Sequence, residues 1–337
     1  MPQAITCPQC NGPITPHRFT RSIVCPYCGN TVELDEAAAS AAVFQDALHA
    51  WNDPASYGIG SVVSLDERHW AVERLLARGS TSDVYAGRLA RWPTELVVLK
   101  VLRDDKDKAL FDNEWAAIQA LRKSRTRGGE VFMRLAPQPV AHGKCSGGEF
   151  AGQRMSIFRW ASGFYHTFED VRRAYPDGIP PRASIWVWRR ILEMLTFIHK
   201  SGMAHGAVLP AHLLVQQGEH GVRLVGYSRA GKLGDALGPV SPEDAAYYPT
   251  GAARWSKLSK RLDLVLSARS VAYLLGGDPA TCDLPGAVPA ALADVVRRVA
   301  LAKYNDLGMD AWELREELGA LSRQVFGAPK FCPIEME

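Results

Sequence analysis

Hydrophobic and polar residues alternate with a period of two through residues 69–89 and 95–103. Because successive side chains of a strand point to opposite faces of a sheet, this period predicts three short strands. Residues 108–123 instead carry apolar side chains at the spacing of one helix face. Alternation returns at residues 130–145 and 154–161, where we expect further strands.

Helical spacing dominates the second half of the chain. It begins near residues 167–176 and is clearest in residues 182–202. Strands that come first and helices that come later indicate an α+β fold with two lobes or layers. The apolar residues expected in the core include Leu192, Leu195, Phe197, Leu213, Leu214, Leu274 and Leu275.

The N-terminal segment holds four of the seven cysteines, as two Cys-x-x-Cys pairs: Cys7 with Cys10, and Cys25 with Cys28. Four thiolates at this spacing can surround one tetrahedral Zn²⁺. Gly29, directly after the second pair, allows the backbone to turn tightly around the metal. Since all four ligands are protein thiolates, no position is open to water, and we expect a structural zinc site.

The overall charge is too balanced to indicate a nucleic-acid or membrane surface. The 337 residues carry 39 basic and 36 acidic side chains, for a net charge of +3. No apolar run reaches the roughly 20 residues of a membrane helix, and no secretory signal is seen, so we expect a soluble, cytoplasmic protein. Two basic clusters, at residues 122–127 and 254–261, either receive an acidic or phosphorylated partner segment or are solvated loops.

Composition divides the chain into four parts. We expect a zinc ribbon at residues 1–36, whose folding depends on its metal because so short a piece buries little apolar surface. Residues 37–60 read as an alanine-rich helical linker, residues 61–325 as the main domain, and residues 326–337 as a docking tail.

Three short motifs stand at intervals in the main domain. The stretch "VVLK" ends at Lys100, "HGAVLPAHLLV" begins at His205, and "VRLVGYSRAG" contains Gly226. Together with the order of strands and helices, these motifs resemble the protein-kinase fold over roughly residues 65–322. The resemblance implies a bilobal fold, with a small sheet-rich lobe and a larger helical lobe, preceded by the small zinc ribbon.

The nucleotide-binding positions of kinases are partly kept. Of the glycine-rich loop only Gly79 remains, with Ala77 and Ser82 at the outer positions. Lys100 matches the strand lysine that reaches the α and β phosphates, and Glu114 matches its partner on a helix. The resemblance implies a vestigial nucleotide cleft. Alternatively, an ion pair between these two residues only links helix to sheet.

The catalytic-loop positions are largely replaced. His205 matches the first position of the pattern His-Arg-Asp, whereas Gly206 replaces the arginine and Ala207 replaces the catalytic aspartate. An alanine methyl group cannot accept a proton. Leu209 stands at a lysine position and His212 at the metal-binding asparagine. We interpret this histidine as packed or hydrogen-bonded, because imidazole is a poor substitute for an oxygen ligand of Mg²⁺.

The remaining kinase positions divide in the same way. Gly226 stands where kinases carry the aspartate of Asp-Phe-Gly, so no side chain is present there to hold Mg²⁺. Thr250 takes the place of the glutamate in Ala-Pro-Glu. Asp263 matches the aspartate that opens the central helix and anchors the catalytic-loop backbone. The resemblance therefore implies a loop that keeps its shape without its reactive groups.

The replacements at Ala207 and Gly226 predict that the chain is not an enzyme but a pseudokinase, which acts as a scaffold or allosteric regulator of a partner protein. No catalytic residue is assigned, ATP binding is left open, and ATP hydrolysis is not expected. Two alternatives remain: a nucleotide-binding enzyme with other transferase chemistry, and a zinc ribbon that binds a client protein or nucleic acid. We expect a protein partner and no nucleic acid, and leave the oligomeric state open.

Overall fold

The chain forms two compact units in the computed structural model. One unit, here called the sheet unit, consists of Met1–Arg103 and Val140–Trp160, and the other, the helical unit, of Asp104–Pro139 and Ala161–Glu337. The predicted linker helix lies outside the described residues except for Leu48 and His49, which are helical. The domain boundaries expected from composition stay a prediction. The structure describes residues 5–15, 22–33, 48–49, 61–216, 221–251 and 253–336.

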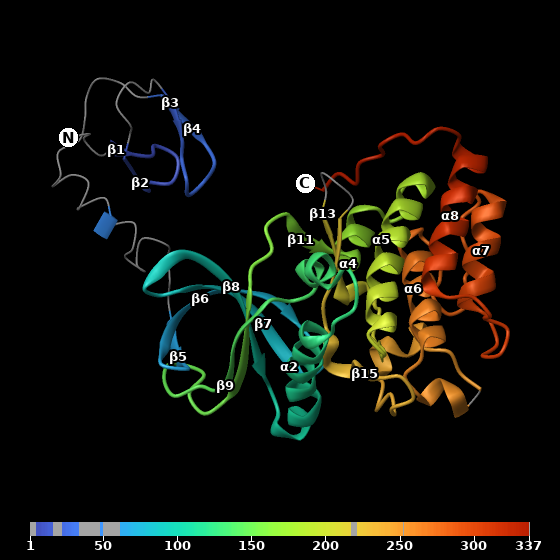
Figure 1. The fold of residues 1–337 in the computed structure, drawn as a ribbon, viewed down its shortest axis with the longest axis horizontal. Coiled ribbons are helices and arrows are strands. Elements are labelled where there is room, and N and C mark those ends of the chain that lie inside the picture. Colours follow the sequence, from blue (N-terminus) through green and yellow to red (C-terminus); the bar gives the residue numbers. More distant parts are fainter. Residues whose placement is uncertain are drawn as a thin grey trace. The chain divides into compact units, whose positions relative to one another are not determined.

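The N-terminal segment forms two short antiparallel hairpins (Figure 1). The buried cluster of this segment is small and consists of Ile14, Val32, Cys7 and Cys25. So little apolar surface cannot hold the segment together alone, which is why metal binding and folding are expected to be coupled here. The strands are β1 (Ile5–Thr6), β2 (Pro13–Ile14), β3 (Ser22–Val24) and β4 (Thr31–Glu33).

A six-stranded sheet with the order β5-β6-β7-β8-β10-β9 makes up the rest of the sheet unit (Figure 1). Its buried side chains include Trp70, Leu99 and Ile157. Burial alternates along β8, at Val97, Leu99 and Val101, whereas β6 and β10 bury consecutive residues. The three strands expected in residues 69–103 and the strand near 154–161 are confirmed. The bounds are β5 (Ser61–Leu65), β6 (Arg68–Arg78), β7 (Ser82–Leu89), β8 (Trp92–Leu102), β9 (Pro139–Lys144) and β10 (Arg154–Arg159).

The strand expected at residues 130–145 is wrong for its first half. Two helical turns, α3 (Gly129–Phe132) and η3 (Met133–Leu135), precede β9. Arg223, from far along the chain, donates Nη1 to the carbonyl of Arg134 at 2.9 Å and Nη2 to that of Ala136 at 2.6 Å. Backbone carbonyls that a strand would use in its ladder are thus bound by a distant guanidinium, a contact that local periodicity does not reveal.

The helical unit is built around long helices that pack side by side, α5 against α8 and α6, and α6 against α7 (Figure 1). The helices predicted at residues 108–123, 167–176 and 182–202 are confirmed. The predicted core leucines and Phe197 are buried except Leu214, which is half-buried. The bounds are α2 (Lys108–Lys123), α4 (Phe168–Ala174), α5 (Pro181–Lys200), α6 (Lys260–Leu274), α7 (Ala290–Ala300) and α8 (Ala311–Phe326).

Short strands place the kinase-like motifs of the helical unit beside one another. The hairpin of β13 and β14 pairs Leu213 with Leu224, so the residues just before and just after it come together. Strand β11 pairs with β13, and β12 pairs with β15. The bounds are β11 (Phe164–Thr167), β12 (Met203–Ala204), η4 (Pro210–His212), β13 (Leu213–Gln216), β14 (Val222–Leu224), η5 (Tyr227–Arg229), β15 (Gly231–Lys232), η6 (Pro242–Tyr247) and η7 (Ala253–Ser256).

The segment after α8 returns to the helical unit. Ile334 is buried, and the Tyr175 hydroxyl donates to the carbonyl of Glu335 at 2.9 Å while its oxygen lies 3.0 Å from the amide nitrogen of the same residue. The predicted tail therefore docks on its own chain. Among the described residues, no helix has both the length and the apolar character needed to span a bilayer.

Candidate functional site

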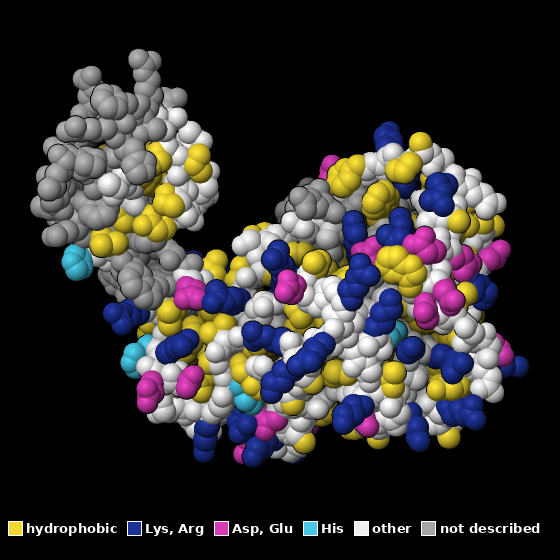
Figure 2. Space-filling view, viewed as in Figure 1, with side chains coloured by type: hydrophobic (Ala, Val, Ile, Leu, Met, Phe, Trp, Pro, Cys, Tyr) yellow, Lys and Arg dark blue, Asp and Glu magenta, His cyan; other side chains and the backbone are white. Residues whose placement is uncertain are grey.

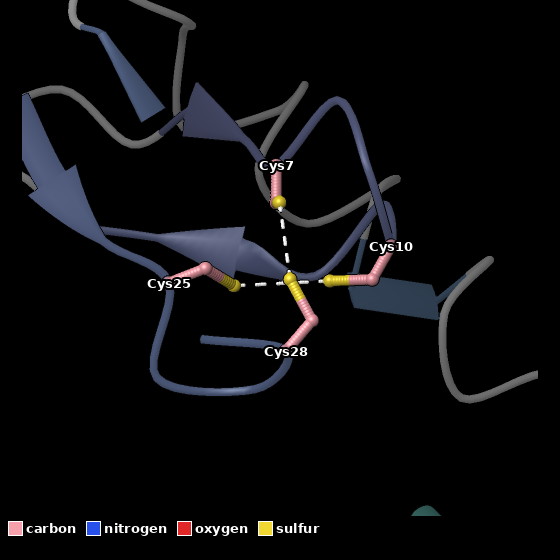
Figure 3. Close-up of side chains that lie close together, drawn as sticks. All are labelled: Cys7, Cys10, Cys25 and Cys28. Carbon is pink, nitrogen blue, oxygen red and sulfur yellow. Dashed lines mark hydrogen bonds between the residues drawn. The ribbon is translucent and has the colours of Figure 1, made fainter. Parts of the chain in front are cut away.

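Four cysteine thiols converge at the N-terminal hairpins (Figure 3). Their Sγ atoms all lie within 4.8 Å of one another, and the pairs Cys7 with Cys28 and Cys10 with Cys25 are each 3.7 Å apart. Four sulfurs at about 2.3 Å from a tetrahedral metal would be separated by about 3.8 Å. The spacing of the thiols therefore fits one tetrahedral ion, and the cluster can bind a metal.

Both cysteine pairs use the same backbone turn. The carbonyl of Cys7 accepts the amide of Asn11 at 2.8 Å, and that of Cys25 accepts the amide of Gly29 at 2.9 Å. The residue whose amide donates in each turn has a left-handed backbone conformation, with φ of +58° at Asn11 and +74° at Gly29. Asparagine and glycine are the residues that adopt this conformation most readily, so each pair is shaped by the residue that follows it. The tight turn expected at Gly29 is present, and its role around a metal stays a prediction.

The turn between β6 and β7 is closed upon itself. The amide of Gly79 donates to the carbonyl of Ser82 at 2.8 Å, and the guanidinium of Arg103 donates to the carbonyls of Gly79 and Ser80, the latter at 2.7 Å. A phosphate cradle needs backbone N–H groups that point toward the ligand. In this hairpin the amide of the one remaining glycine is already bound within the turn.

The other two predicted cleft residues belong to different units. Lys100 lies in β8, opposite Ser156 of β10 and Val84 of β7. Glu114 lies in α2, where it is 2% exposed and accepts the backbone amide of Tyr227 at 3.1 Å. The ion pair expected between the two residues stays a prediction.

Asp263, at the start of α6, holds the catalytic-loop backbone. Its fully buried carboxylate accepts the amides of His205 and Gly206, each at 2.8 Å, and lies 2.9 Å from Nε2 of His199. A carboxylate can accept about four hydrogen bonds, and these three contacts use most of that capacity. Burial of a charged group is costly unless it is hydrogen-bonded in this way. The anchoring role that the resemblance implied for Asp263 is thus present in the geometry.

His205 is a framework residue of the loop. It is fully buried, and burial lowers the pKa of its imidazole to about 3. Its Nδ1 accepts the amide of Ala207 at 3.2 Å, and its ring meets that of Tyr227 edge-on with centroids 4.4 Å apart. The imidazole is therefore neutral at physiological pH and shapes the turn from within.

His212 is hydrogen-bonded to the loop, which confirms the interpretation of this histidine as a packed or hydrogen-bonded residue. Its Nδ1 donates to the carbonyl of Ala207 at 2.8 Å. The amide of Val225 in turn donates to the carbonyl of His212 at 2.9 Å, which joins the two motifs on either side of the β13–β14 hairpin. The methyl group of Ala207 is itself fully buried. This position accordingly offers neither a proton acceptor nor access to solvent.

The imidazole of His212 fills the space beside Gly226. A Cβ atom at Gly226 would lie 2.4–2.6 Å from three atoms of that ring, closer than real Cβ contacts. Gly226 also has φ of +76°, a conformation that L-residues with side chains adopt rarely. The space that the side chain of an aspartate would need beside the backbone at this position is therefore occupied by the ring.

Gly206 is required by its surroundings in the same way. It has φ of +72°, and an added Cβ would lie 2.5 Å from a methyl group of Leu258 and 3.0 Å from the carbonyl of Arg229. The hydroxyl of Tyr248 donates to the carbonyl of Gly206 at 2.8 Å. The arginine of the kinase pattern does not fit at this position without movement of its neighbours.

Two residues that hold this region were not found from the sequence. Asn113, next to Glu114 in α2, donates its amide to the carbonyls of Ser228 and Ala230, each at 2.8 Å. Tyr248 binds the loop at Gly206, as described above. Asparagine within a helix and tyrosine in an irregular segment carry no spacing signal, so only the tertiary contacts identify them.

The sheet unit, the helical unit and the order of the motifs along the chain together define a protein-kinase-like fold. Solved structures that share it include the following two. The BubR1 kinase domain matches with a TM-score of 0.57 and 14% identity over 78% of this chain and 83% of that one. A rhoptry kinase from Toxoplasma gondii matches with a TM-score of 0.53 and 13% identity over 79% and 86%. At such identities the likeness concerns the fold alone.

Curated relatives at the sequence level are also kinases. The serine/threonine-protein kinases PknF of Mycobacterium tuberculosis (strain H37Rv) and Mycobacterium bovis are 25% identical to this chain over 217 residues. The match covers 62% of this chain and 43% of theirs, so the chain spans less than half of their length. No protein-family model matches the chain.

Proposed function

We propose that this protein is a catalytically inactive kinase-like protein that acts as a scaffold or allosteric regulator of a partner protein. The observation that supports the proposal is the contact between His212 and Gly226, beside a buried Ala207. Phosphoryl transfer by kinases depends on an aspartate that accepts the substrate hydroxyl proton and on a second aspartate that holds Mg²⁺. Here the first is a methyl group, and the place of the second is filled by a ring.

The retained parts support a role for the shape of the fold. Asp263 and the buried, neutral His205 keep the loop in a defined conformation. Glu114 and Asn113 hold the segment after Gly226 against α2. A chain that had no use for this region would not need a buried carboxylate with three partners, since such groups are costly to bury. A defined surface without chemistry suits binding of a partner.

We further propose that the metal held by Cys7, Cys10, Cys25 and Cys28 is Zn²⁺ in a structural role. Thiolates select zinc among the common divalent ions, and four of them leave no open coordination position. The metal would supply the stability that the small core of the ribbon lacks. We assign the ribbon no chemistry beyond this role.

A single-turnover phosphorylation assay tests the proposal. The full chain is mixed in excess over radiolabelled ATP with Mg²⁺, with casein as an added acceptor, and label is followed on both proteins. We expect no incorporation above buffer, because neither the proton acceptor nor the metal ligand is present.

A contaminating kinase is excluded by two lysine variants. Lys100→Ala removes the lysine in β8, whereas Lys108→Ala removes an exposed lysine at the start of α2. Incorporation that disappears in Lys100→Ala and persists in Lys108→Ala would overturn the proposal. Incorporation equal in both variants would be traced to another enzyme in the preparation.

A further inference from the structure

Three cationic side chains line one surface depression in the helical unit. The depression has a volume of about 440 Å³ and is lined by Arg254, Lys257, Arg261, Tyr304 and Ala253. No carboxylate belongs to this lining. Among the described residues none forms an ion pair with any of these three cations. The positive charge at this place is therefore uncompensated within the part of the chain that the structure describes.

The two arginines are held in place by neutral groups. Arg254 donates Nη1 to the side-chain oxygen of Asn305 at 3.0 Å, and Arg261 donates Nε to the carbonyl of Leu307 at 2.8 Å. Both guanidinium groups lie over the ring of Tyr304, at 5.7 Å and 5.1 Å from its centroid. Each arginine has five N–H donors, so most of its donors are left for another acceptor.

Tyr304 is fixed in turn by the buried Trp255, which meets it edge-on with ring centroids 4.8 Å apart. An aromatic ring that carries two guanidinium groups orients them before any ligand arrives. Pre-orientation lowers the entropic cost of binding. Such an arrangement is more specific than a group of flexible exposed lysines.

The cluster also stands at the wrong end of a helix for charge balance. Arg261 lies in the first turn of α6, whose N-cap is Ser259. The N-terminal end of a helix carries partial positive charge, which favours anions and disfavours cations. The acidic residue of that turn, Asp263, is buried and bound to the catalytic-loop backbone, so it does not neutralise the cluster.

The other basic cluster provides an internal comparison. Arg122 and Lys123 lie in the last turn of α2, where cations stabilise the helix end. These two cations therefore have a helix end to stabilise. Arg261 instead lies at a helix N-terminus, and the neutral groups that hold it and Arg254 do not balance their charge, which an incoming anion would do.

We infer that the depression formed by Arg254, Lys257, Arg261 and Tyr304 binds a phosphorylated side chain in a segment of a partner protein. A phosphate monoester carries a charge near −2 and three acceptor oxygens, which suits two guanidinium groups and one ammonium group better than a single carboxylate does. Arginine clusters recognise phosphorylated peptides in this way. The inference rests on the proposed function in that the anion belongs to another protein.

The charge pattern favours a single phosphate over an extended polyanion. On the face shown in Figure 2, Lys and Arg side chains are spread out, with Asp and Glu side chains between them. A nucleic acid would need a continuous track of cations along its backbone. The three cations gathered in one depression instead offer a local site for one dianion.

The inference is tested by binding of the intact chain to two immobilised pools of seven-residue peptides, which differ only in a central phosphothreonine or threonine. We expect the phosphorylated pool to bind at least about tenfold more tightly. Lys257→Glu and the double change Arg254→Ala with Arg261→Ala should each lower that binding by about tenfold or more. The matched control, Arg122→Ala with Lys123→Ala, should leave it unchanged.

Lys257→Glu keeps the test valid should the arginine variants fold poorly, because the described residues give its exposed side chain no partner. Equal binding of both pools, or equal loss in the control variant, would overturn the inference. So would full displacement of the phosphorylated pool by inorganic phosphate at equal concentration, which would indicate a free anion. Binding of a mixed-sequence RNA in place of the peptide would also overturn it.

These outcomes are separate from those of the phosphorylation assay. A chain that neither transfers phosphate nor prefers phosphopeptides would lose this inference and keep the proposed function. A chain that prefers phosphopeptides and also transfers phosphate would keep the binding site and lose the claim of inactivity.

Discussion

The cysteine cluster and the catalytic-loop region use their residues in opposite ways. In the N-terminal hairpins two of the four cysteines that can bind a metal, Cys7 and Cys25, are also two of the four residues of the buried cluster. In the loop region Asp263 and His205 hold the backbone, whereas Ala207 and Gly226 occupy the two positions at which kinases carry reactive aspartates. Chemistry and folding depend on the same residues in one region and on different residues in the other.

The difference explains what each region can lose. Under the proposed zinc role, removal of one ribbon cysteine would abolish metal binding and with it the fold of the ribbon. The loop has a defined conformation with Ala207 and Gly226 where kinases carry aspartates, because Asp263 and His205 hold its backbone. Four predictions test this contrast.

The largest effect is expected on removal of a metal ligand. Cys25→Ser should abolish metal binding and unfold the ribbon, since structural zinc contributes about 10–16 kcal/mol to folding of such small units. Metal content by atomic emission and the dispersion of backbone amide signals of residues 5–33 would measure this. Cys332→Ser, outside the cluster, is the control, and a metal content unchanged by Cys25→Ser would contradict the assignment.

A framework residue of the loop should have the next largest effect. Asp263→Ala leaves two buried backbone amides and His199 without their acceptor, and we expect a loss of about 3–5 kcal/mol in the free energy of unfolding. Urea denaturation followed by circular dichroism measures the loss. Asp294→Ala, at a side chain that is 76% exposed, should change stability by less than about 0.5 kcal/mol. Similar values for the two variants would remove the distinction between framework and reactive positions.

A smaller loss in the free energy of unfolding is expected when an aspartate is introduced at Gly226. Gly226→Asp should destabilise the protein by about 2–3 kcal/mol, from the left-handed backbone and the contact with His212. Adding His212→Asn should restore at least about 1 kcal/mol, measured as the coupling in a double-mutant cycle. Gly234→Asp has a similar φ with no atom nearby, so it isolates the backbone cost. Strictly additive effects would show that the ring does not fill the site.

The smallest effect is on pH dependence. The pKa of His205 is about 3 in the folded protein and about 6.5 when unfolded, so the unfolded chain binds the extra proton between these values. Stability from this residue is complete above pH 6.5 and falls as the pH is lowered, by about 2 kcal/mol at pH 5. In His205→Asn the free energy of unfolding should no longer show this decrease with falling pH. In His69→Asn, at an exposed residue, the decrease should remain. An equal slope in both variants would refute a buried neutral imidazole.

The parts that could be predicted from sequence depend on local spacing. The two Cys-x-x-Cys pairs, the helix over residues 108–123 and the strands β6 to β8 all follow from residues near one another in the chain. Trp186 and Trp188 illustrate the same point, since residues two apart on a helix face different ways, and the structure makes the second fully buried and the first half-buried.

The parts that could not be predicted depend on contacts between distant segments. The helical turns before β9 are fixed by Arg223, almost 90 residues away. The sequence identified His212 as a packed residue, but its contact with Gly226 exists only because the β13–β14 hairpin brings the two together. Residue identity alone showed that an aspartate was absent at Gly226, and the structure added that its space was taken.

The contact between His212 and Gly226 also bears on how such a chain could change over generations. An aspartate introduced alone at Gly226 meets the ring, and an asparagine introduced alone at His212 still leaves Gly226 without a carboxylate. Neither step brings an advantage by itself, and the first lowers stability. Under the proposed function, a route to phosphate transfer therefore passes through a less stable intermediate, and we expect an inactive form to persist in its lineage.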